Sequence, residues 1–323
     1  MNLPPVGAEL VSIGVPVFNG AAFIADALSA LQRQTYQHLE IFISDNASDD
    51  STGSICEAMA AEDRRIEYVR QTKNIGASQN FNFVFRSTSG PYFMWAAHDD
   101  MWHPKYIESC LELLLSDPKA VLAGSSVRFL SPSGTCKDLP LQADNPELLS
   151  DDPARRLSGL LTRHGWRSIY GLMRRSALQQ TQLFRPCYGP DVVLLAELAM
   201  LGRFRNVPQK LFFYRRYDDR TEEDRASSVA PDVRVSHMDL AMTILKAAHE
   251  HARGWRPLLF GAVTVLLGSG SWNRKFVRQY RSAATAHWQR RRWFRWVGTI
   301  AVYGFFRLYS GVRRRLPYAT QLR

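Results

Sequence analysis

The sequence predicts an α/β protein with a mostly parallel, doubly wound sheet. Short apolar segments that suit buried strands alternate with helical segments over the first half of the 323-residue chain. Hydrophobic residues make up 46% of the chain, which is enough to bury a large core, so a folded protein is expected rather than a disordered one. Ligands of such sheets bind beyond the carboxyl ends of the strands.

The first three strands are expected at residues 11–17, 39–44 and 66–70, which are short and mainly apolar. The helix after the first strand places its apolar residues on one face: Phe23, Ile24, Ala27, Leu28 and Leu31. Shorter helical patterns follow the second and third strands, around residues 55–59 and 81–85. This alternation predicts right-handed crossovers between neighbouring parallel strands.

The expected fourth strand, residues 92–97, stops at His98-Asp99-Asp100. Two adjacent carboxylates at the end of an apolar strand need something cationic to hold them. At the mouth of a parallel sheet, the usual cation is a divalent metal that carries a diphosphate. The alternative is a solvated turn that caps a helix beginning near Pro104.

Polar residues also follow the other three predicted strands: Asn19, Asp45 and Asn74. The carboxyl ends of parallel strands meet at one edge of the sheet, so these side chains are expected to lie near Asp99. A random scatter of loop residues would not occupy every strand end. The pattern therefore favours an active site over a capped turn.

The second half of the predicted domain is less regular. Residues 131–152 are polar and rich in Pro and Asp, which is typical of a surface excursion, and residues 169–178 return to the core. An apolar helix begins at Gly189-Pro190-Asp191 and ends at Gly202, and a last strand is expected at residues 211–216. The charged residues 217–235 then suggest a mobile lid.

Four ordered motifs carry a resemblance to a known family: V-S-I-G-V-P-V-F-N-G, I-S-D-N-A-S-D-D-S-T, K-N-I-G-A-S-Q-N-F-N and W-A-A-H-D-D-M-W-H-P. In this order and spacing they resemble family 2 glycosyltransferases, which are inverting enzymes with the glycosyltransferase A fold. The resemblance covers roughly residues 10–220. We expect a catalytic domain at residues 8–220, and the composition that follows indicates a charged connecting segment at 221–250 and a basic, aromatic, membrane-associating helical tail at 251–323.

The resemblance implies transfer of a hexosyl or deoxyhexosyl group from a nucleotide-diphosphate sugar. The acceptor would be a saccharide or lipid-linked saccharide hydroxyl, in cell-envelope or exopolysaccharide synthesis. The residues that it assigns to the donor are Pro16, Phe18, Asn19, Asp45, Lys73, Asn74, Gly76, Asn80, His98 and Asp99. Asp99, with Asp100, is expected to hold Mg²⁺ or Mn²⁺ against the diphosphate, because the family's other metal acid falls at Ala97 here.

Asp191 matches the family's general base, which removes the proton of the acceptor hydroxyl. From the residues alone, Asp191 is equally well a first-turn acid favoured by the helix dipole. Tyr170, Gly171 and Arg174 lie in the segment that faces the acceptor in relatives. The alternative for these three is a tyrosine packed on the sheet and arginine pairs at its edge.

The tail differs in charge from the rest of the chain. Residues 251–323 contain 15 Lys or Arg and no Asp or Glu, whereas the remainder contains 26 basic and 30 acidic residues. Aromatic residues are interspersed, which favours a helix lying on an anionic membrane surface over a helical cap packed on the domain or a single-stranded nucleic acid partner. We expect a cytoplasmic protein that is peripheral on the inner face of the cytoplasmic membrane.

Two further observations limit the function classes. Four widely spaced cysteines form no C-x-x-C pair, which argues against a zinc site or a disulfide framework and suits a reducing compartment. A sugar nucleotidyltransferase would need a Gly-rich phosphate loop near the first strand, and residues 16–20 do not provide one. The remaining alternative to an enzyme is a degenerate, non-catalytic sugar-nucleotide-binding or membrane-adaptor protein.

Overall fold

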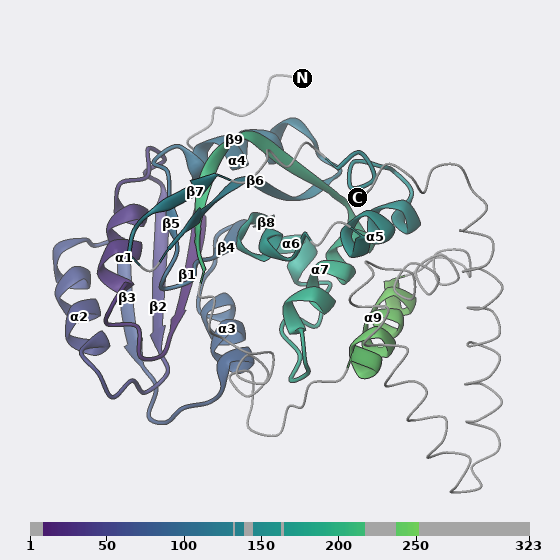
Figure 1. Cartoon of the computed structure of the whole chain (residues 1–323). Helices are drawn as coiled ribbons and strands as arrows, with labels where there is room; N and C mark the ends of the chain where they lie inside the picture. The colour runs from purple at the N-terminus through teal and green to yellow at the C-terminus, as the bar shows by residue number, and fades with distance from the viewer. Residues whose placement is uncertain (1–8, 132, 139–144, 163–164, 217–236, 252–323) are drawn as a thin grey trace, which may run out of the picture.

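The computed structural model describes residues 9–131, 133–138, 145–162, 165–216 and 237–251 (Figure 1). The strands of this part are β1 (Val11–Val17), β2 (Leu39–Asp45), β3 (Ile66–Arg70), β4 (Tyr92–Trp95), β5 (Met101–Trp102), β6 (Ala120–Leu130), β7 (Cys136–Asp138), β8 (Leu172–Arg174) and β9 (Arg203–Arg215). Its helices are α1 (Ile24–Gln32), α2 (Thr52–Glu62), α3 (Ala77–Arg86), α4 (Tyr106–Ser116), α5 (Pro153–Thr162), α6 (Arg175–Leu178), α7 (Pro190–Leu201) and α9 (His237–His251), with a 3-10 turn η1 (Gly165–Tyr170).

All nine of these strands join one sheet in the order β3-β2-β1-β4-β8-β6-β9-β5, with β7 on β6. The first four strands in this order are parallel, as predicted. Val17, Asp45 and Arg70 are register partners at the ends of β1, β2 and β3. The predicted α/β class is confirmed, and the first three strand ends meet at one edge of the sheet.

Helices cover both faces of the sheet, as a doubly wound fold requires (Figure 1). Phe93 and Trp95 of β4 pack in one core with α3, α5, α6, α7 and α9. Tyr92 and Met94 of the same strand pack in the opposite core with α1, α2 and α4. Alternate residues of a fully buried strand therefore serve two separate cores, which explains the nearly continuous apolar sequence of β4.

The second half of the sheet is mixed. Strand β6 was not among the predicted elements, and it pairs in parallel with β9 and antiparallel with β7 and β8. The strand expected at residues 211–216 is the end of the longer β9. The excursion expected at residues 131–152 contains β7 in its described part. The end of β9 contacts the chain just after the β1 loop, where Arg215 lies over the Phe23 ring.

Helix α9 lies in the segment that was expected to be a charged connection. Leu240, Ile244 and Ala247 are buried in the core that contains α7, so residues 237–251 are part of the folded body rather than a linker. The expected lid (217–235) falls entirely outside the described residues, and so does the tail beyond residue 251. Among the described helices, none combines the length and hydropathy needed to cross a bilayer.

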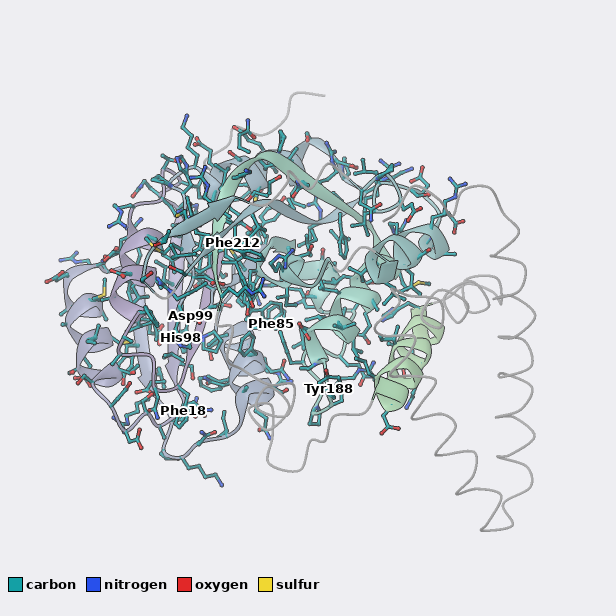
Figure 2. All side chains as sticks on the ribbon, viewed as in Figure 1. Phe18, Phe85, His98, Asp99, Tyr188 and Phe212 are labelled. Carbon is teal, nitrogen blue, oxygen red and sulfur yellow. The ribbon has the colours of Figure 1, made fainter. Side chains whose placement is uncertain are left out.

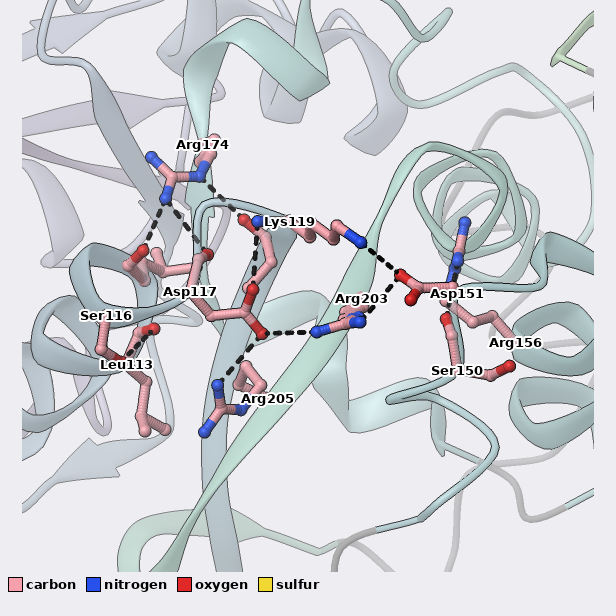
Figure 3. A network of polar contacts seen from close by, with 12 residues as sticks. Leu113, Ser116, Asp117, Lys119, Ser150, Asp151, Arg156, Arg174, Arg203 and Arg205 are labelled. Atoms are coloured by element: carbon pink, nitrogen blue, oxygen red, sulfur yellow. Dashed lines mark hydrogen bonds and ion pairs between the residues drawn. The ribbon is translucent and has the colours of Figure 1, made fainter.

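A charged network fixes the chain where α4 leads into β6 and where β9 begins (Figure 3). Asp117 Oδ2 accepts hydrogen bonds from Arg205 at 3.1 Å and Arg203 at 3.5 Å, and its Oδ1 accepts the Lys119 N–H at 3.1 Å. Arg203 also donates to Asp151 at 2.8 Å. Burial raises the pKa of Asp117, but these bonds and the two guanidinium charges outweigh burial and leave its pKa lowered.

Replacing Asp117 by Asn should reduce the free energy of unfolding by about 1 kcal/mol at pH 7, because it removes a partly buried charge that two arginines share. A lowered folded-state pKa stabilises the protein above the unfolded-state pKa, so the difference should shrink below about pH 4. Urea unfolding across this pH range measures the effect. Asp151→Asn, which changes an exposed acid of the same network, should have a smaller effect. Equal losses in the two variants would contradict the account.

Candidate active site

The loops after β1 and β2 are joined by hydrogen bonds at the carboxyl edge of the sheet. The Asn19 N–H donates to Ser48 Oγ at 2.9 Å, and Asn19 Oδ1 accepts the Asp49 N–H at 3.0 Å. Asn19 has a φ of 50°, a left-handed conformation that asparagine tolerates. The preceding Phe18 is 44% exposed, while Pro16 is buried within β1. Phe18 and Asn19 therefore form the exposed part of this loop.

Asp45 lies at the end of β2, but its side chain is fully buried. Its Oδ1 accepts the Ser48 N–H at 2.9 Å, and its Oδ2 accepts the Tyr68 hydroxyl at 3.0 Å. Burial raises the pKa of Tyr68, as does this bond to Asp45, so the phenol stays protonated and donates. In this arrangement the Asp45 carboxylate holds the β2 loop through Ser48 and contacts Tyr68 of β3, and its contact with a base or ribose stays a prediction.

The loop after β3 is joined to the loop after β2 by hydrogen bonds. Asn46 donates to Asn74 Oδ1 at 2.9 Å, and Asn74 Oδ1 also accepts the Gly76 N–H at 2.8 Å. Gly76 has φ 82° and ψ 154°, a conformation that is essentially restricted to glycine. Lys73 and Asn74 are exposed at this rim. The structure thus brings the predicted donor residues of three loops to one edge.

Asn80, predicted as a donor residue, is buried on α3. Its Oδ1 accepts the Ser44 hydroxyl at 2.6 Å, and its Nδ2 donates to the Ser44 carbonyl at 2.9 Å. Both functions of the amide are therefore used to hold α3 against the end of β2. Asn80, like Asp45, is buried below the rim, and its contact with the donor stays a prediction.

His98 and Asp99 follow β4 and lie beside the β1 loop (Figure 2). A Cβ added at Gly20 would come within 2.7 Å of the His98 ring, so the imidazole packs directly on that glycine. Both residues are partly exposed. The fourth strand end therefore joins the rim formed by the other three, as the sequence predicts.

Asp100 is only 1% exposed and is incompletely paired. Its Oδ1 accepts the Arg215 N–H at 2.7 Å, whereas its Oδ2 has no hydrogen-bond partner among the described residues. Burial raises the pKa of Asp100 well above the ordinary range, the neighbouring Asp99 charge adds to this, and Arg215 opposes it. A buried carboxylate oxygen with no partner is suited to a cation.

These acids fit a metal that is bound together with a diphosphate. Within the described residues, no group of three or more His, Cys, Asp or Glu could hold a metal by itself. Mg²⁺ is commonly held by one or two carboxylates, with phosphate oxygens and water completing the coordination. Asp99 and Asp100 supply two carboxylates, and Oδ2 of Asp100 has no hydrogen-bond partner among the described residues.

Arg215 is a site residue that the sequence did not predict. Its Nε donates to the Asp99 carbonyl at 2.8 Å, its Nη1 donates to the Ser131 carbonyl at 3.1 Å, and its Cζ lies 4.1 Å from the Phe23 ring centroid. The end of β9 therefore fixes the position of Asp99 and Asp100, which we call the acidic pair. The sequence shows only an arginine at a strand end, and nothing in that pattern separates a buried clamp from a solvated side chain.

Tyr170 lies at the end of η1 and packs against aromatic residues of β9. Its ring centroid lies 5.8 Å from that of Phe212 and 6.5 Å from that of Tyr214. Burial raises the pKa of Tyr170, and the charges of Asp100, Tyr214, Asp99 and Asp191 add to the shift. The Tyr170 ring, at the end of η1, therefore packs against the aromatic side chains of β9. That Asp99 and Asp191 meet at one site stays a prediction.

Asp191 occupies the first turn of α7, after Gly189 in a left-handed conformation and Pro190 at the first helical position. Burial raises its pKa above the ordinary value of 3.8, although hydrogen bonds from the Val192 N–H and its own N–H oppose the shift. A carboxylate with a raised pKa is a stronger base than a solvated one. Asp191 is therefore suited to accept a proton from a bound hydroxyl.

Replacing Gly189 by Ala should displace this base. The residue has a φ of 65°, and an added Cβ would lie 2.9 Å from Leu240 Cδ2 on α9. The left-handed conformation alone costs a non-glycine residue about 1–2 kcal/mol. We expect a loss of this size in urea unfolding, together with a lower transfer rate. Gly134→Ala, at a φ of 85° in open space, is the control, and it should lose stability without losing rate.

The other two predicted acceptor residues have structural partners. A Cβ at Gly171 would lie 2.8 Å from the Ala123 carbonyl oxygen, so the chain passes too close for a side chain. Arg174 donates to the carbonyls of Ala120 at 2.8 Å and Leu114 at 2.5 Å. These contacts agree with the alternative of arginine interactions at the sheet edge. Tyr170 remains the member of this segment at the site.

The comparisons with known proteins agree with this fold. The chain is 30% identical over 151 residues to an uncharacterized glycosyltransferase of Rickettsia felis, an alignment that covers 43% of this chain and only 24% of that protein. The fold is similar to S. aureus TarS 1-349 in complex with UDP-GlcNAc, with a TM-score of 0.57, 15% identity and coverage of 74% of this chain and 66% of that one. It is also similar to the mannosyltransferase PcManGT from Pyrobaculum calidifontis in complex with GDP-Man and Mn²⁺, with a TM-score of 0.54, 18% identity and coverage of 93% and 87%.

A family model shows to which protein family the chain belongs, which these partial similarities to single proteins do not. The Glycosyl transferase family 2 model matches residues 12–180, which is just over half of the chain. The matched region contains β1 to β4, the acidic pair and Tyr170. The chain belongs to glycosyl transferase family 2.

Proposed function

We propose that the chain is an inverting glycosyltransferase that moves a sugar from a nucleotide-diphosphate donor to a hydroxyl of a saccharide or lipid-linked saccharide. The single observation that carries this proposal is the acidic pair after β4, in which Arg215 holds the Asp99 carbonyl and Asp100 Oδ1 while the buried Asp100 Oδ2 has no hydrogen-bond partner among the described residues. An acidic pair suited to a metal–diphosphate and a separate carboxylate suited to a base are the two groups that such a transfer needs. The UDP-GlcNAc and GDP-Man complexes of the structural relatives support this donor class.

The exposed rim residues would contact the donor: Phe18, Asn19, Lys73, Asn74 and His98. Phe18 offers an exposed aromatic surface to a nucleobase. Asp45 and Asn80, which are buried, would affect donor binding indirectly by fixing the loops that carry these exposed residues. This division assigns Asp45 and Asn80 to support, because their polar atoms already have partners in the chain.

Asp99 and Asp100 would hold the divalent metal, Mg²⁺ or Mn²⁺. When bound, such an ion supplies positive charge that stabilises the leaving diphosphate. Arg215 keeps the two acids in place through the Asp99 carbonyl and Asp100 Oδ1. The unpartnered Asp100 Oδ2 supports this assignment, since a permanently bare buried carboxylate would cost stability.

Asp191 would accept the proton of the acceptor hydroxyl as its oxygen attacks the anomeric carbon. The bond between that carbon and the diphosphate oxygen breaks on the opposite side, which inverts the configuration. Positioned proton removal contributes about 10²- to 10⁴-fold to a rate. The basic residues of 251–323 favour an acceptor at an anionic membrane surface.

The proposal is tested by incubating the full chain with a panel of nucleotide sugars, Mn²⁺ and a membrane extract, and measuring released nucleoside diphosphate. We expect release from one donor class and a product of inverted anomeric configuration. Calorimetry with UDP or GDP and Mn²⁺ tests the non-catalytic alternative. Absence of both release and binding would reject the enzyme.

A further inference from the structure

Residues 182–189 form the loop that leads into α7, and we call them the α7 loop. The beginning of the α7 loop is fixed on α3. Asn82 Nδ2 donates to the Phe184 carbonyl at 2.8 Å, and Asn82 Oδ1 accepts the Phe184 N–H at 2.9 Å. The Phe184 ring centroid also lies 5.0 Å from that of Trp95 on β4. The α7 loop is therefore anchored to the central part of the fold before it reaches α7.

Arg185 connects the α7 loop with two helices. Its Nη2 donates to Glu197 Oε1 on α7 at 2.5 Å and to Glu250 Oε2 on α9 at 3.0 Å. Glu197 is fully buried, and its Oε2 accepts the Gln182 N–H of the same loop at 3.2 Å. His251 Nε2 lies 3.8 Å from Glu197 Oε1. One guanidinium thus compensates a buried acid on α7 and links the α7 loop to α9.

Helix α9 lies alongside α7 and also contacts the end of the α7 loop (Figure 1). A Cβ added at Gly189 would lie 2.9 Å from Leu240 Cδ2 on α9. Gly189 has a left-handed φ of 65°, and Pro190, the first residue of α7, follows it. Since Asp191 comes next, its turn is held by contacts at Arg185 and Gly189 that both involve α9.

We propose that Arg185 is a positioning residue for Asp191, the proposed base. By pairing with Glu197 and Glu250, it holds the α7 loop in the place from which Asp191 meets the acceptor hydroxyl. This inference rests on the proposed function, because that function assigns the base. Arg185, Glu197 and Glu250 lie beyond residue 180, where the match to the family model ends, so membership in the family does not assign them this role. Misplacing a catalytic group by about 1 Å can lower a rate by about 10²-fold.

The main test variant carries Arg185→Gln and Glu197→Gln in one chain. Arg185→Gln alone would leave the buried Glu197 charge without its guanidinium, which is strongly destabilising, whereas the double variant removes both charges. We expect the kcat of transfer to fall by at least about 10-fold, with an unchanged donor KM and an unchanged affinity for UDP or GDP with Mn²⁺. Glu250→Gln removes only the α9 contact, whose carboxylate is 33% exposed, and should lower kcat less. Glu62→Gln, at the exposed end of α2, is the matched control and should leave kcat unchanged.

The thiol of Cys187 reports on the α7 loop without any turnover. The Cys187 N–H donates to the Arg185 carbonyl at 2.8 Å. Burial raises the pKa of Cys187 to about 11, and the Arg185 charge opposes this shift, so loss of that charge alone would leave less thiolate and slow alkylation. We expect iodoacetamide to label Cys187 at least about 10-fold faster in the double variant, because a loosened loop exposes the thiol. Mass spectrometry should show Cys56 and Cys110 still protected, with the exposed Cys136 as the internal reference.

A lower kcat at unchanged donor affinity, together with faster labelling of Cys187 alone, is the expected result. Unchanged labelling, or a wild-type kcat in the double variant, would overturn the inference. A joint loss of kcat and donor affinity would assign the ion pairs to donor support, and labelling of Cys56 and Cys110 would assign them to general stability, so either result also overturns it. Absence of transfer in the wild-type chain would reject the proposed function, whereas the labelling rates would still show whether Arg185 holds the α7 loop.

Discussion

Replacing Asp191 by Asn should lower the rate of sugar transfer by about 10²- to 10⁴-fold, because the acceptor hydroxyl then has no positioned base. The substitution keeps the size of the side chain and its place in the first turn of α7. The donor affinity should stay close to that of wild type, since the donor rim and the acidic pair are built from other elements. Steady-state kinetics with the identified donor, together with calorimetry of nucleoside diphosphate and Mn²⁺, measures both quantities.

The pH dependence of transfer gives a second readout of Asp191. A base must be deprotonated to work, so the rate should fall as the pH drops through the pKa of this carboxyl. Burial raises that pKa above 3.8, which places the acid limb at a higher pH than a solvated aspartate would give. This limb should be missing from the residual activity of the Asp191→Asn variant.

Asp151→Asn serves as the control for these measurements, because it removes an exposed acid of the network in Figure 3. It should leave the rate and the acid limb unchanged. Wild-type turnover in the Asp191→Asn variant would reject the assignment of the base. A combined loss of turnover and donor affinity would instead indicate that α7 supports the donor.

Replacing Asp99 by Asn should remove most of the metal-dependent part of donor binding. A divalent ion contributes several kcal/mol to stabilising diphosphate charge, which corresponds to more than about 100-fold in affinity or rate. In wild type, nucleoside diphosphate should bind more tightly with Mn²⁺ than with EDTA. In the Asp99→Asn variant the two dissociation constants should be nearly equal. Calorimetry with UDP and GDP measures them.

Asp49→Asn, which changes an exposed acid of the β2 loop, is the control for Asp99→Asn. Asp49 is not one of the two proposed metal acids, so metal-dependent binding should persist in this variant. A wild-type protein whose dissociation constant is the same with and without Mn²⁺ would show that Asp99 and Asp100 do not hold a metal. The lack of a third protein ligand among the described residues makes this test decisive.

The parallel half of the sheet was predictable because its strands are short, apolar and separated by clear turns. The ends of β1 and β3 agree with the prediction, and β2 extends it by one residue. The strand-end acids were predictable for the same reason, since parallel strands bring their carboxyl ends together. Strand β6 was missed because its sequence, A-V-L-A-G-S-S-V-R-F-L, mixes apolar, small and charged residues without clear alternation.

Helix α9 and the buried polar contacts depend on tertiary structure. His237–His251 contains several polar residues, and only its packing on α7 shows which of its residues are buried. Asp45 and Asn80 match motif positions, yet their partners come from Tyr68 and Ser44 on other parts of the chain. Sequence spacing shows which residues follow a strand, but not which of them point into the protein.

The most direct test of the central claim is a crystal structure of the Asp191→Asn variant with Mn²⁺ and the intact donor. We predict the ion between the Asp99 carboxylate and the diphosphate, with residue 191 and Tyr170 facing the anomeric carbon of the same bound sugar. A donor held away from Asp99, or a sugar whose anomeric carbon lies outside the reach of residue 191, would contradict the account.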